Sequence, residues 1–238
     1  MKQIILKLVR LAIGLFLYPC GIAMTIKADL GLATWDVLHQ GIGIAIGITI
    51  GQASIALGVV IIIVTSFFGE RLGWGTLANI IAIGGLLDIF LFYEVFPTFT
   101  ALIPRFIMLI VGIATMGLAT YFYMSAELGS GPRDSLMVAI KKRSKKSVRF
   151  IRISIESIAT FIGFLLGGKV GIGTLVMAVC FGYFIQFFFN LFKFDISKIE
   201  HRFIDHDIRA LHNYIKNKRD KNKDSKIDDK TKDYSSDA

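Results

Sequence analysis

Apolar residues in this chain gather into six runs of about 20 residues, and each run is long enough to cross a lipid bilayer as one helix. Lipid offers the backbone no hydrogen bonds, so a chain that crosses it forms helices or a closed barrel. Hydrophobic residues make up 54% of the sequence, above the roughly 45–50% of soluble domains. We therefore predict an all-α, polytopic membrane protein with six spans: Ile4–Ile26, Ile50–Phe68, Leu77–Phe96, Arg105–Met124, Val148–Leu166 and Thr174–Phe192.

The net charge of +9 is distributed in a way that indicates membrane topology rather than nucleic-acid binding. Lysine and arginine cluster in residues 2–10, in residues 141–149 and in the tail after Phe192, whereas residues 27–49 contain Lys27 as their one basic residue. Basic loops stay on the cytoplasmic side of a membrane. We therefore expect both termini in the cytoplasm, the lipid bilayer as the main partner, and no nucleic acid.

The second half of the sequence repeats the polar and glycine pattern of the first half with a constant shift of 98 positions. Gly73, Gly75 and Thr76 correspond to Gly171, Gly173 and Thr174, and "ADLGLATWDVL" at 28–38 corresponds to "AELGSGPRDSL" at 126–136. Each half contains three spans, an odd number, so the second half must enter the membrane in the opposite orientation. The sequence predicts a 3+3 inverted repeat with boundaries 1–98 and 99–194, an arrangement typical of secondary transporters.

Short helices are expected after the first and fourth spans, at the membrane interface. The tail predicts an amphipathic cytoplasmic helix over residues 195–216, followed by a disordered charged segment over 217–238 that lacks large apolar residues. Cys20 and Cys180 lie in apolar runs and suggest no disulfide framework.

Several of these motifs resemble the YczE/YyaS/YitT family of bacterial membrane proteins, and the YczE-like branch most of all. The motifs are "TIKADLGLATWDVL" at 25–38, "TIGQ" at 49–52, "LGWGTL" at 72–77, "LGSGPRDSLM" at 128–137, "SVRFIR" at 147–152 and "GGKVGIGTL" at 167–175. The resemblance covers about residues 1–192. It implies an integral protein of the bacterial cytoplasmic membrane and leaves the substrate open.

Polar residues inside the apolar runs are the candidates for a substrate site. Asp88 falls near the middle of the third run, where an ionisable group costs roughly 2.5–3.5 kcal/mol and needs a partner or a wet cavity. Its counterpart is Gln186, and each follows a glycine by four residues. The candidate substrate-binding residues are Asp88, Gln186, Asn190, Gly84 and Gly182. The alternative is structural: glycines allow close helix contact, and polar pairs hold helices together.

Two further groups of residues have a candidate role. Asp36 and Asp134 open the two short helices, where they either cap the helix or act with Gly31 and Gly129 as gates. Arg152 and Glu156 are four residues apart on one helix face and are expected to form an ion pair.

The leading functional hypothesis is a transporter or permease for an unidentified small molecule, with a site between the two halves and alternating access by rocking of one half against the other. The alternative is a non-transporting partner or regulator that recruits a protein through the basic loop and tail. No nucleotide loop, nucleophile–base set or metal motif occurs in the sequence, so we expect no enzyme activity, no cofactor and no metal.

Overall fold

The computed structural model describes residues 2–70, 73–129 and 131–194, and these residues form eight helices without a strand. The expected tail helix at 195–216 and the disordered segment at 217–238 lie outside the described residues. The helices are α1 (Lys2–Ala28), α2 (Thr34–Ile46), α3 (Ile50–Phe67), α4 (Trp74–Phe92), α5 (Leu102–Met124), α6 (Pro132–Arg143), α7 (Val148–Leu165) and α8 (Ile172–Leu191).

Five helices of the described part are long and apolar enough to cross a membrane, namely α1, α3, α4, α5 and α8. The prediction named a sixth span at Val148–Leu166, and this segment is indeed a helix, α7. It differs from the other five because Arg149, Arg152 and Glu156 fall within its 18 residues. The short helices expected after the first and fourth spans are present as α2 and α6.

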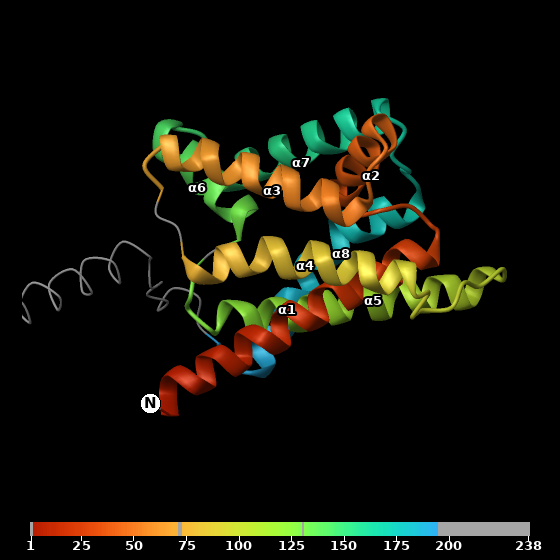
Figure 1. Cartoon of the computed structure of the whole chain (residues 1–238), viewed down its shortest axis with the longest axis horizontal. Helices are drawn as coiled ribbons and strands as arrows, with labels where there is room; N and C mark the ends of the chain where they lie inside the picture. The colour runs from red at the N-terminus through yellow and green to blue at the C-terminus, as the bar shows by residue number, and fades with distance from the viewer. Residues whose placement is uncertain (1, 71–72, 130, 195–238) are drawn as a thin grey trace, which may run out of the picture. The chain divides into compact units, whose positions relative to one another are not determined.

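The helices form two bundles, and each bundle takes two helices from each half of the sequence. In the first, which we call the α1/α5 bundle, α1 packs against α4 and α5, and α5 packs against α8. In the second, the α2/α7 bundle, α2 and α6 each pack against both α3 and α7. The bundles appear as a lower and an upper layer in Figure 1. Packing of α3 against α4 joins them.

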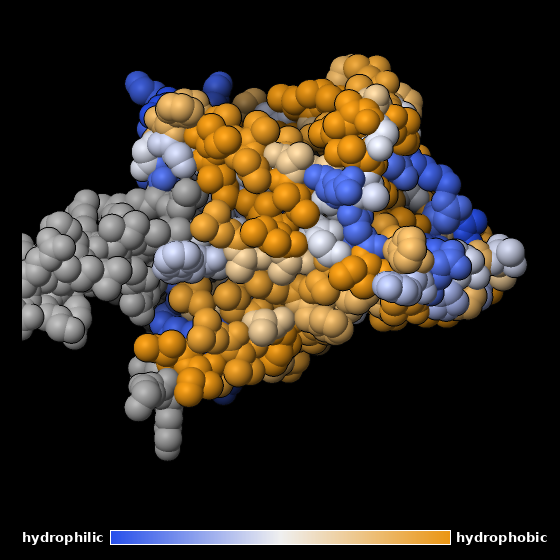
Figure 2. All heavy atoms as spheres, viewed as in Figure 1, coloured by the Kyte–Doolittle hydropathy of each residue, from blue (hydrophilic) through white to orange (hydrophobic). Residues whose placement is uncertain are grey.

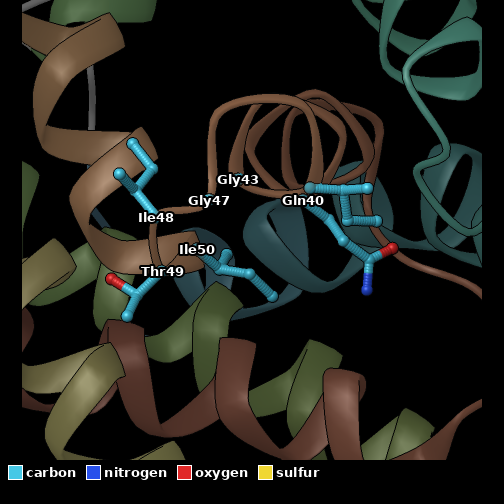
Figure 3. Close-up of a pocket in the computed structure, with 7 residues that line it drawn as sticks. Gln40, Gly43, Gly47, Ile48, Thr49 and Ile50 are labelled. Atoms are coloured by element: carbon cyan, nitrogen blue, oxygen red, sulfur yellow. The ribbon is translucent and has the colours of Figure 1, made fainter.

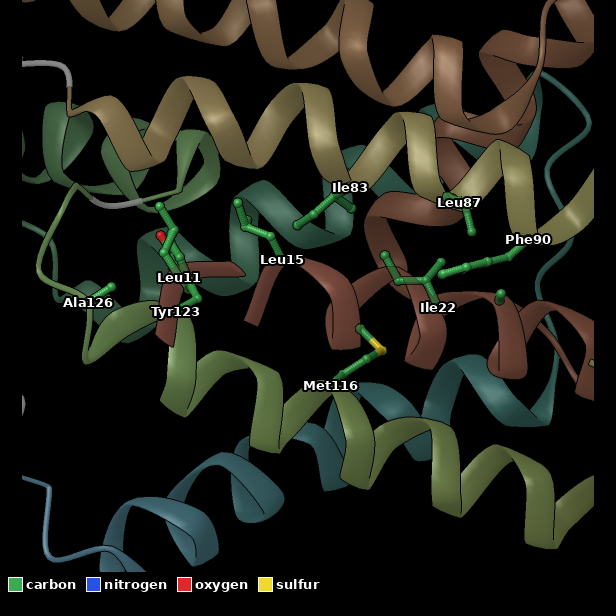
Figure 4. Packing of buried hydrophobic residues seen from close by; sticks show 10 residues of the cluster. Leu11, Leu15, Ile22, Ile83, Leu87, Phe90, Met116, Tyr123 and Ala126 are labelled. Atoms are coloured by element: carbon green, nitrogen blue, oxygen red, sulfur yellow. The ribbon is translucent and has the colours of Figure 1, made fainter. Parts of the chain in front are cut away.

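Close packing of small residues explains the contact between α1 and α5. A Cβ atom on Gly21 of α1 would lie 2.7 Å from the Gly112 carbonyl oxygen of α5, so no larger side chain fits there. Around this crossing, α1, α4 and α5 bury a cluster of apolar side chains (Figure 4). The cluster contains Leu11, Leu15, Ile22, Ala23, Ile83, Leu87, Phe90, Met116, Tyr123 and Ala126.

The loops after α1 and α5 make matching contacts with the beginnings of α8 and α4. The Leu30 carbonyl accepts from Gly173 N–H at 2.7 Å, and the Leu128 carbonyl, 98 positions later, accepts from Gly75 N–H at 2.8 Å.

Two ion pairs are also related by the shift of 98 positions. Lys7 binds Glu127 at 2.6 Å, and Arg105 binds Asp29 at 3.1 Å. Each pair therefore joins one half of the sequence to the other, and the two pairs are related by the shift of 98 positions.

Large apolar side chains cover much of the outer surface of the helices. Figure 2 shows hydrophobic residues across the face formed by α1, α3 and α4, with hydrophilic residues toward its two ends. Exposed examples on other helices include Phe161 on α7 and Val179 on α8, which are 62% and 64% exposed. Such a belt is expected on a protein that lies in lipid, because hydrocarbon removes the cost of exposing apolar side chains.

Candidate functional site

Asp88 lies near the end of α4 and bonds to the beginning of α3. Its Oδ1 accepts from the Gly51 backbone N–H at 2.8 Å, and its Oδ2 accepts from the Thr49 hydroxyl at 2.5 Å. Thr49 also forms the capping box of α3 with Gln52, as "TIGQ" predicts. A carboxylate at the positive end of a helix is favourable. Asp88 therefore ties the first turn of α3 to α4.

The depth of Asp88 differs from the sequence-based expectation. Helix α4 ends at Phe92, four residues after Asp88, so the carboxylate lies about 6 Å from the helix end at 1.5 Å per residue. A span that continued to Phe96 would have placed it closer to the middle. The helix stops early because Glu94 adopts a positive φ of 48° and Pro97 cannot continue a helix.

Gly84 allows α3 and α4 to pack closely beside Asp88. A Cβ atom on Gly84 would lie 2.5 Å from Ile55 Cγ1 and 2.6 Å from the Gly51 carbonyl oxygen. Further along the pair, a Cβ atom on Gly58 would lie 2.9 Å from Ile80 Cγ1. The two helices are therefore in contact over much of their length. This geometry supports the packing role that the sequence left open for Gly84 and Asp88.

The equivalent residues of the second half have no such cover. Gln186 Nε2 donates to Asn190 Oδ1 at 3.2 Å along the exposed face of α8. A Cβ atom on Gly182 would meet no atom within 4 Å. Among the described residues, α8 packs along α5 and not along α7. The polar face of α8 is therefore open, while the equivalent face of α4 is covered by α3.

Replacing Asp88 by asparagine should lower the free energy of unfolding by about 1.5–3 kcal/mol, the range for hydrogen bonds to charged groups. The amide is neutral, and it cannot accept through both terminal atoms as the carboxylate does with Gly51 N–H and the Thr49 hydroxyl. Unfolding in SDS mixed micelles, followed by circular dichroism, measures the loss. The control is Glu94→Gln, because the Glu94 carboxylate is 79% exposed in its pair with Lys27. Its loss should stay below about 1 kcal/mol, and equal losses in the two variants would contradict the proposed tie.

Asp36, a gating or capping candidate, forms a buried pair with His39. Asp36 lies in the first turn of α2, and its Oδ1 is 3.3 Å from His39 Nδ1. Their side chains are only 2% and 3% exposed. The Arg133 guanidinium of α6 lies 3.9 Å from Asp36 Oδ1 and 5.0 Å from the centre of the Trp35 ring. The beginnings of α2 and α6 therefore meet in one polar cluster.

Tyrosine side chains of α1 and α5 lie close to these polar residues. The Tyr18 hydroxyl of α1 is within electrostatic reach of Asp36, Arg133, Asp134 and Arg152. On α5, the Tyr123 hydroxyl lies beside Gly131 at the start of α6, where a Cβ atom would be 3.2 Å from the oxygen. We call Asp36, His39, Arg133, Asp134 and Tyr18 the central cluster. It brings together both bundles.

Gly31 and Gly129 lie in the matching loops rather than in the central cluster. Their φ angles are 114° and 129°, and a Cβ atom would lie 2.6 Å from Gly171 N in the first case and 2.7 Å from Thr76 Oγ1 in the second.

Arg152 and Glu156 form the expected ion pair, with Arg152 Nε 3.0 Å from Glu156 Oε1 on α7. The Thr160 hydroxyl donates to the Glu156 carbonyl one turn later. Arg152 is 54% exposed and Glu156 28%, so the pair contributes little to stability. Together the three side chains form a polar stripe along α7.

A pocket of about 400 Å³ opens between the end of α2 and the beginning of α3 (Figure 3). It is lined by Gln40, Gly43, Ile44, Gly47, Ile48, Thr49 and Ile50. Thr49 connects this pocket to Asp88, and the Gln40 amide oxygen accepts from Lys169 N–H at 2.7 Å. With two polar side chains in its wall, the pocket offers few groups for recognising a polar ligand.

The candidate substrate-binding residues and the two acidic gating candidates therefore lie in three places. Asp88 and Gly84 lie at the contact between α3 and α4, while Gln186, Asn190 and Gly182 lie on the open face of α8. Asp36 and Asp134 contribute to the central cluster. In the described part, no group of three or more His, Cys, Asp or Glu side chains could hold a metal ion.

Sequence reasoning missed His39, Arg133 and Tyr18. His39 follows Asp36 by three residues, a spacing that puts both side chains on one helix face, and this signal could have found the pair. No local signal joins Arg133 or Tyr18 to it, because their contacts are long-range.

Residues 5–190 of this chain match a family whose description is "Family of unknown function (DUF6198)". An uncharacterized protein of Haemophilus influenzae is 37% identical over 191 residues, which is 80% of this chain and 85% of the relative. The uncharacterized membrane protein YczE of Bacillus subtilis is 33% identical over 73% of this chain and 81% of its own length.

The uncharacterized protein YyaS of the same bacterium is 30% identical over 71% of this chain and 85% of its own length. These matches confirm the resemblance that the motifs predicted. No solved structure matches the chain.

Proposed function

This chain belongs to the DUF6198 family, and from the geometry of its own helices we propose that it is a secondary transporter or permease for a small molecule. The observation that carries the proposal is the unequal packing of two equivalent helix pairs. Helix α3 covers α4, whereas α7 leaves the face of α8 open. In a transporter that alternates between two states, one side of the substrate path is closed while the other is open.

Two observations support a 3+3 inverted repeat behind this asymmetry. The loop contacts of Leu30 with Gly173 and of Leu128 with Gly75 are related by the shift of 98 positions. The ion pairs Lys7–Glu127 and Arg105–Asp29 obey the same rule. Inverted repeats let a transporter exchange the conformations of its two halves, because each half can adopt the arrangement of the other.

We assign α7 as the sixth span of the cytoplasmic membrane, with both termini of the chain in the cytoplasm. Its buried face, with Ile151 and Ala159, belongs to the α2/α7 bundle. A span that carries Arg152 and Glu156 is favourable only where these side chains meet water or polar partners. A water-filled path between α7 and α8 supplies that environment, and the open polar face of α8 lines its other side.

In this assignment the contact of Asp88 with Thr49 closes the outer side, and the separation of α7 from α8 opens the inner side. The moving units are the two bundles rather than the two halves, because each bundle contains two helices of each half. Reversal would separate α3 from α4 and bring the beginning of α7 onto α8 near Gln186. The substrate would bind at the central cluster, which lies where the bundles meet.

The alternative role as a recruiting partner receives less support from the basic loop. Lys142 pairs with Glu70 at 2.8 Å, and the Arg143 guanidinium lies 4.4 Å from the centre of the Phe68 ring. These two basic side chains therefore hold the end of α6 near the end of α3. That use of the charge fits a structural role inside the bundle better than a docking surface.

A disulfide between α3 and α4 should stop transport. The variant Gly58→Cys/Ile80→Cys, in a Cys20→Ala/Cys180→Ala background, places two thiols at a contact between the bundles. Oxidation should hold the outer side closed, and reduction should restore movement. Vesicles with and without the chain are incubated with a metabolite extract of the host cells, and retained compounds are identified by mass spectrometry.

We expect at least one compound to be enriched only in vesicles that contain the chain, and oxidation of the cysteine pair should remove this enrichment. The matched control is Gly117→Cys/Phe184→Cys, since a Cβ atom on Gly117 would lie 3.1 Å from Phe184 Cβ inside the α1/α5 bundle. That disulfide should leave the enrichment intact. The proposal would be contradicted if no compound of the extract were enriched by the chain, or if both disulfides reduced the enrichment equally.

A further inference from the structure

Asp36 and His39 form a buried pair of titratable side chains in the described part of the chain. Both side chains are at most 3% exposed. Asp36 Oδ1 accepts a hydrogen bond, so the Nδ1 atom of His39 at 3.3 Å carries the hydrogen and Nε2 holds the free lone pair. The sequence contains four histidines, and His39 is the one within the described residues.

Groups from α6 and from α1 lie close to this pair. Helix α6 supplies Arg133, 3.9 Å from Asp36, and also Asp134. Helix α1 of the other bundle supplies Tyr18, whose hydroxyl interacts electrostatically with Asp36 and also with Arg133, Asp134 and, on α7, Arg152. Helix α3 has no titratable side chain between Ile50 and Phe67. The pair therefore lies at the junction of the two bundles, where charges of both signs meet.

Burial is the main influence on the protonation of His39. Burial lowers the pKa of His39 below its ordinary value of 6.5, and the Arg133 charge acts in the same direction. The hydrogen bond to Asp36 opposes both effects by favouring the imidazolium. In this closed environment the ring is neutral at neutral pH. Any movement that admits water removes the dominant influence and leaves the carboxylate to raise the pKa.

We propose that His39, oriented by Asp36, is the group that binds and releases a coupling proton in this transporter. The inference rests on the proposed function and assigns the coupling ion of the same site. Separation of α3 from α4 would admit external water to the first turn of α2, which packs beside α3. His39 Nε2 would then take one proton from that water.

Return to the arrangement seen here buries the pair again and favours loss of that proton, and in the proposed cycle the open side is then the inner one. One proton therefore moves from outside to inside in each cycle. Asp88, a candidate substrate-binding residue, instead remains bonded to Thr49 and Gly51 at the contact between α3 and α4. Proton coupling through His39 therefore does not require Asp88 to break its hydrogen bonds in the arrangement seen here.

The experiment measures the opening between α7 and α8 as a function of pH. Spin labels at Phe150→Cys and Leu191→Cys, both at exposed side chains, report the distance between the first turn of α7 and the last turn of α8. The full chain, in the Cys20→Ala/Cys180→Ala background, is reconstituted in lipid nanodiscs and examined by pulsed electron spin resonance from pH 8 to pH 5.5. A label pair at Val111→Cys and Val179→Cys, within the α1/α5 bundle, should show one distance at every pH.

At pH 8 we expect the long distance of the inner-open arrangement. Acid favours the arrangement in which His39 has the higher pKa, so a shorter distance should appear as the pH falls. His39→Gln should lose this shift between pH 8 and pH 5.5, whereas Glu156→Gln should keep it. Asp36→Asn should move the midpoint to lower pH, because it removes the carboxylate that favours the imidazolium.

A distance distribution that is independent of pH in the unmodified chain would overturn the proposal, as would an unchanged midpoint in His39→Gln. Neither result would decide whether the chain transports a small molecule. That question rests on the vesicle assay with the Gly58→Cys/Ile80→Cys pair, which requires no proton gradient. Enrichment in that assay without any pH response here would identify a transporter with another coupling ion or with none.

Discussion

Valine at position 84 should prevent the chain from folding, whereas valine at the equivalent position 182 should leave the fold intact. The Cβ atom alone would lie 2.6 Å from the Gly51 carbonyl oxygen at Gly84 and would meet nothing within 4 Å at Gly182. A backbone atom cannot move aside as the end of a side chain can. We expect Gly84→Val to cost about 4 kcal/mol or more, the level reached only by severe packing faults.

The two variants can be compared by their yield as a monodisperse detergent-solubilised protein on size-exclusion chromatography, followed by thermal unfolding. Gly182→Val should elute and unfold like the unmodified chain, yet it should lose the transport of any compound found in the vesicle assay. Its branched side chain would occupy the face on which α7 is proposed to close. Equal losses of fold in both variants would mean that α7 already covers α8, and this would contradict the asymmetry on which the function is based.

Alanine at Gly31 and alanine at Gly129 should each destabilise the protein strongly and to a similar extent. Their positive φ angles of 114° and 129° are unfavourable for any residue with a Cβ atom. The new methyl group would also press on Gly171 N in one case and on Thr76 Oγ1 in the other, at 2.6 and 2.7 Å. Strain of about 1–3 kcal/mol adds to this overlap.

Thermal unfolding of the purified variants measures the effect, with Gly47→Ala as the matched control. Gly47 also has a positive φ, 73°, but a Cβ atom there meets nothing within 4 Å. Gly47→Ala should therefore lower the free energy of unfolding by about 1 kcal/mol, the cost of the backbone conformation without a clash. If Gly31→Ala were severe and Gly129→Ala harmless, the loop contacts would not be equivalent, and the repeat would lose its main support.

Local patterns predicted much of the helical structure because helix formation in lipid depends on short stretches of sequence. Runs of apolar residues predicted the positions of all five described helices that are apolar enough to span a membrane. Thr49 and Gln52 of the "TIGQ" motif form the capping box of α3, and Pro132 begins the short helix α6. The glycine and polar motifs also identified the family.

The same patterns were less informative about α7, because its composition is that of a partly charged helix whereas its packing is that of a bundle helix. Its charges remove it from the set of strongly apolar helices, although it packs within a bundle like its counterpart α3. Amphipathic helices of this kind lie at the boundary between a span and a surface helix. Their placement depends on what faces the polar stripe, and composition alone does not record this.

Local sequence decided where helices begin and end, which faces are apolar and how the two halves correspond, because those properties depend on neighbours within a few residues. Tertiary packing decided the rest: the exchange of helices between bundles, the bonds from Asp88 to Thr49 and Gly51, and the meeting of His39 with Arg133. The repeat makes Gly84 and Gly182 equivalent in sequence. Only packing makes them different, because α3 contacts α4 beside Gly84, whereas a Cβ atom on Gly182 would meet no atom within 4 Å.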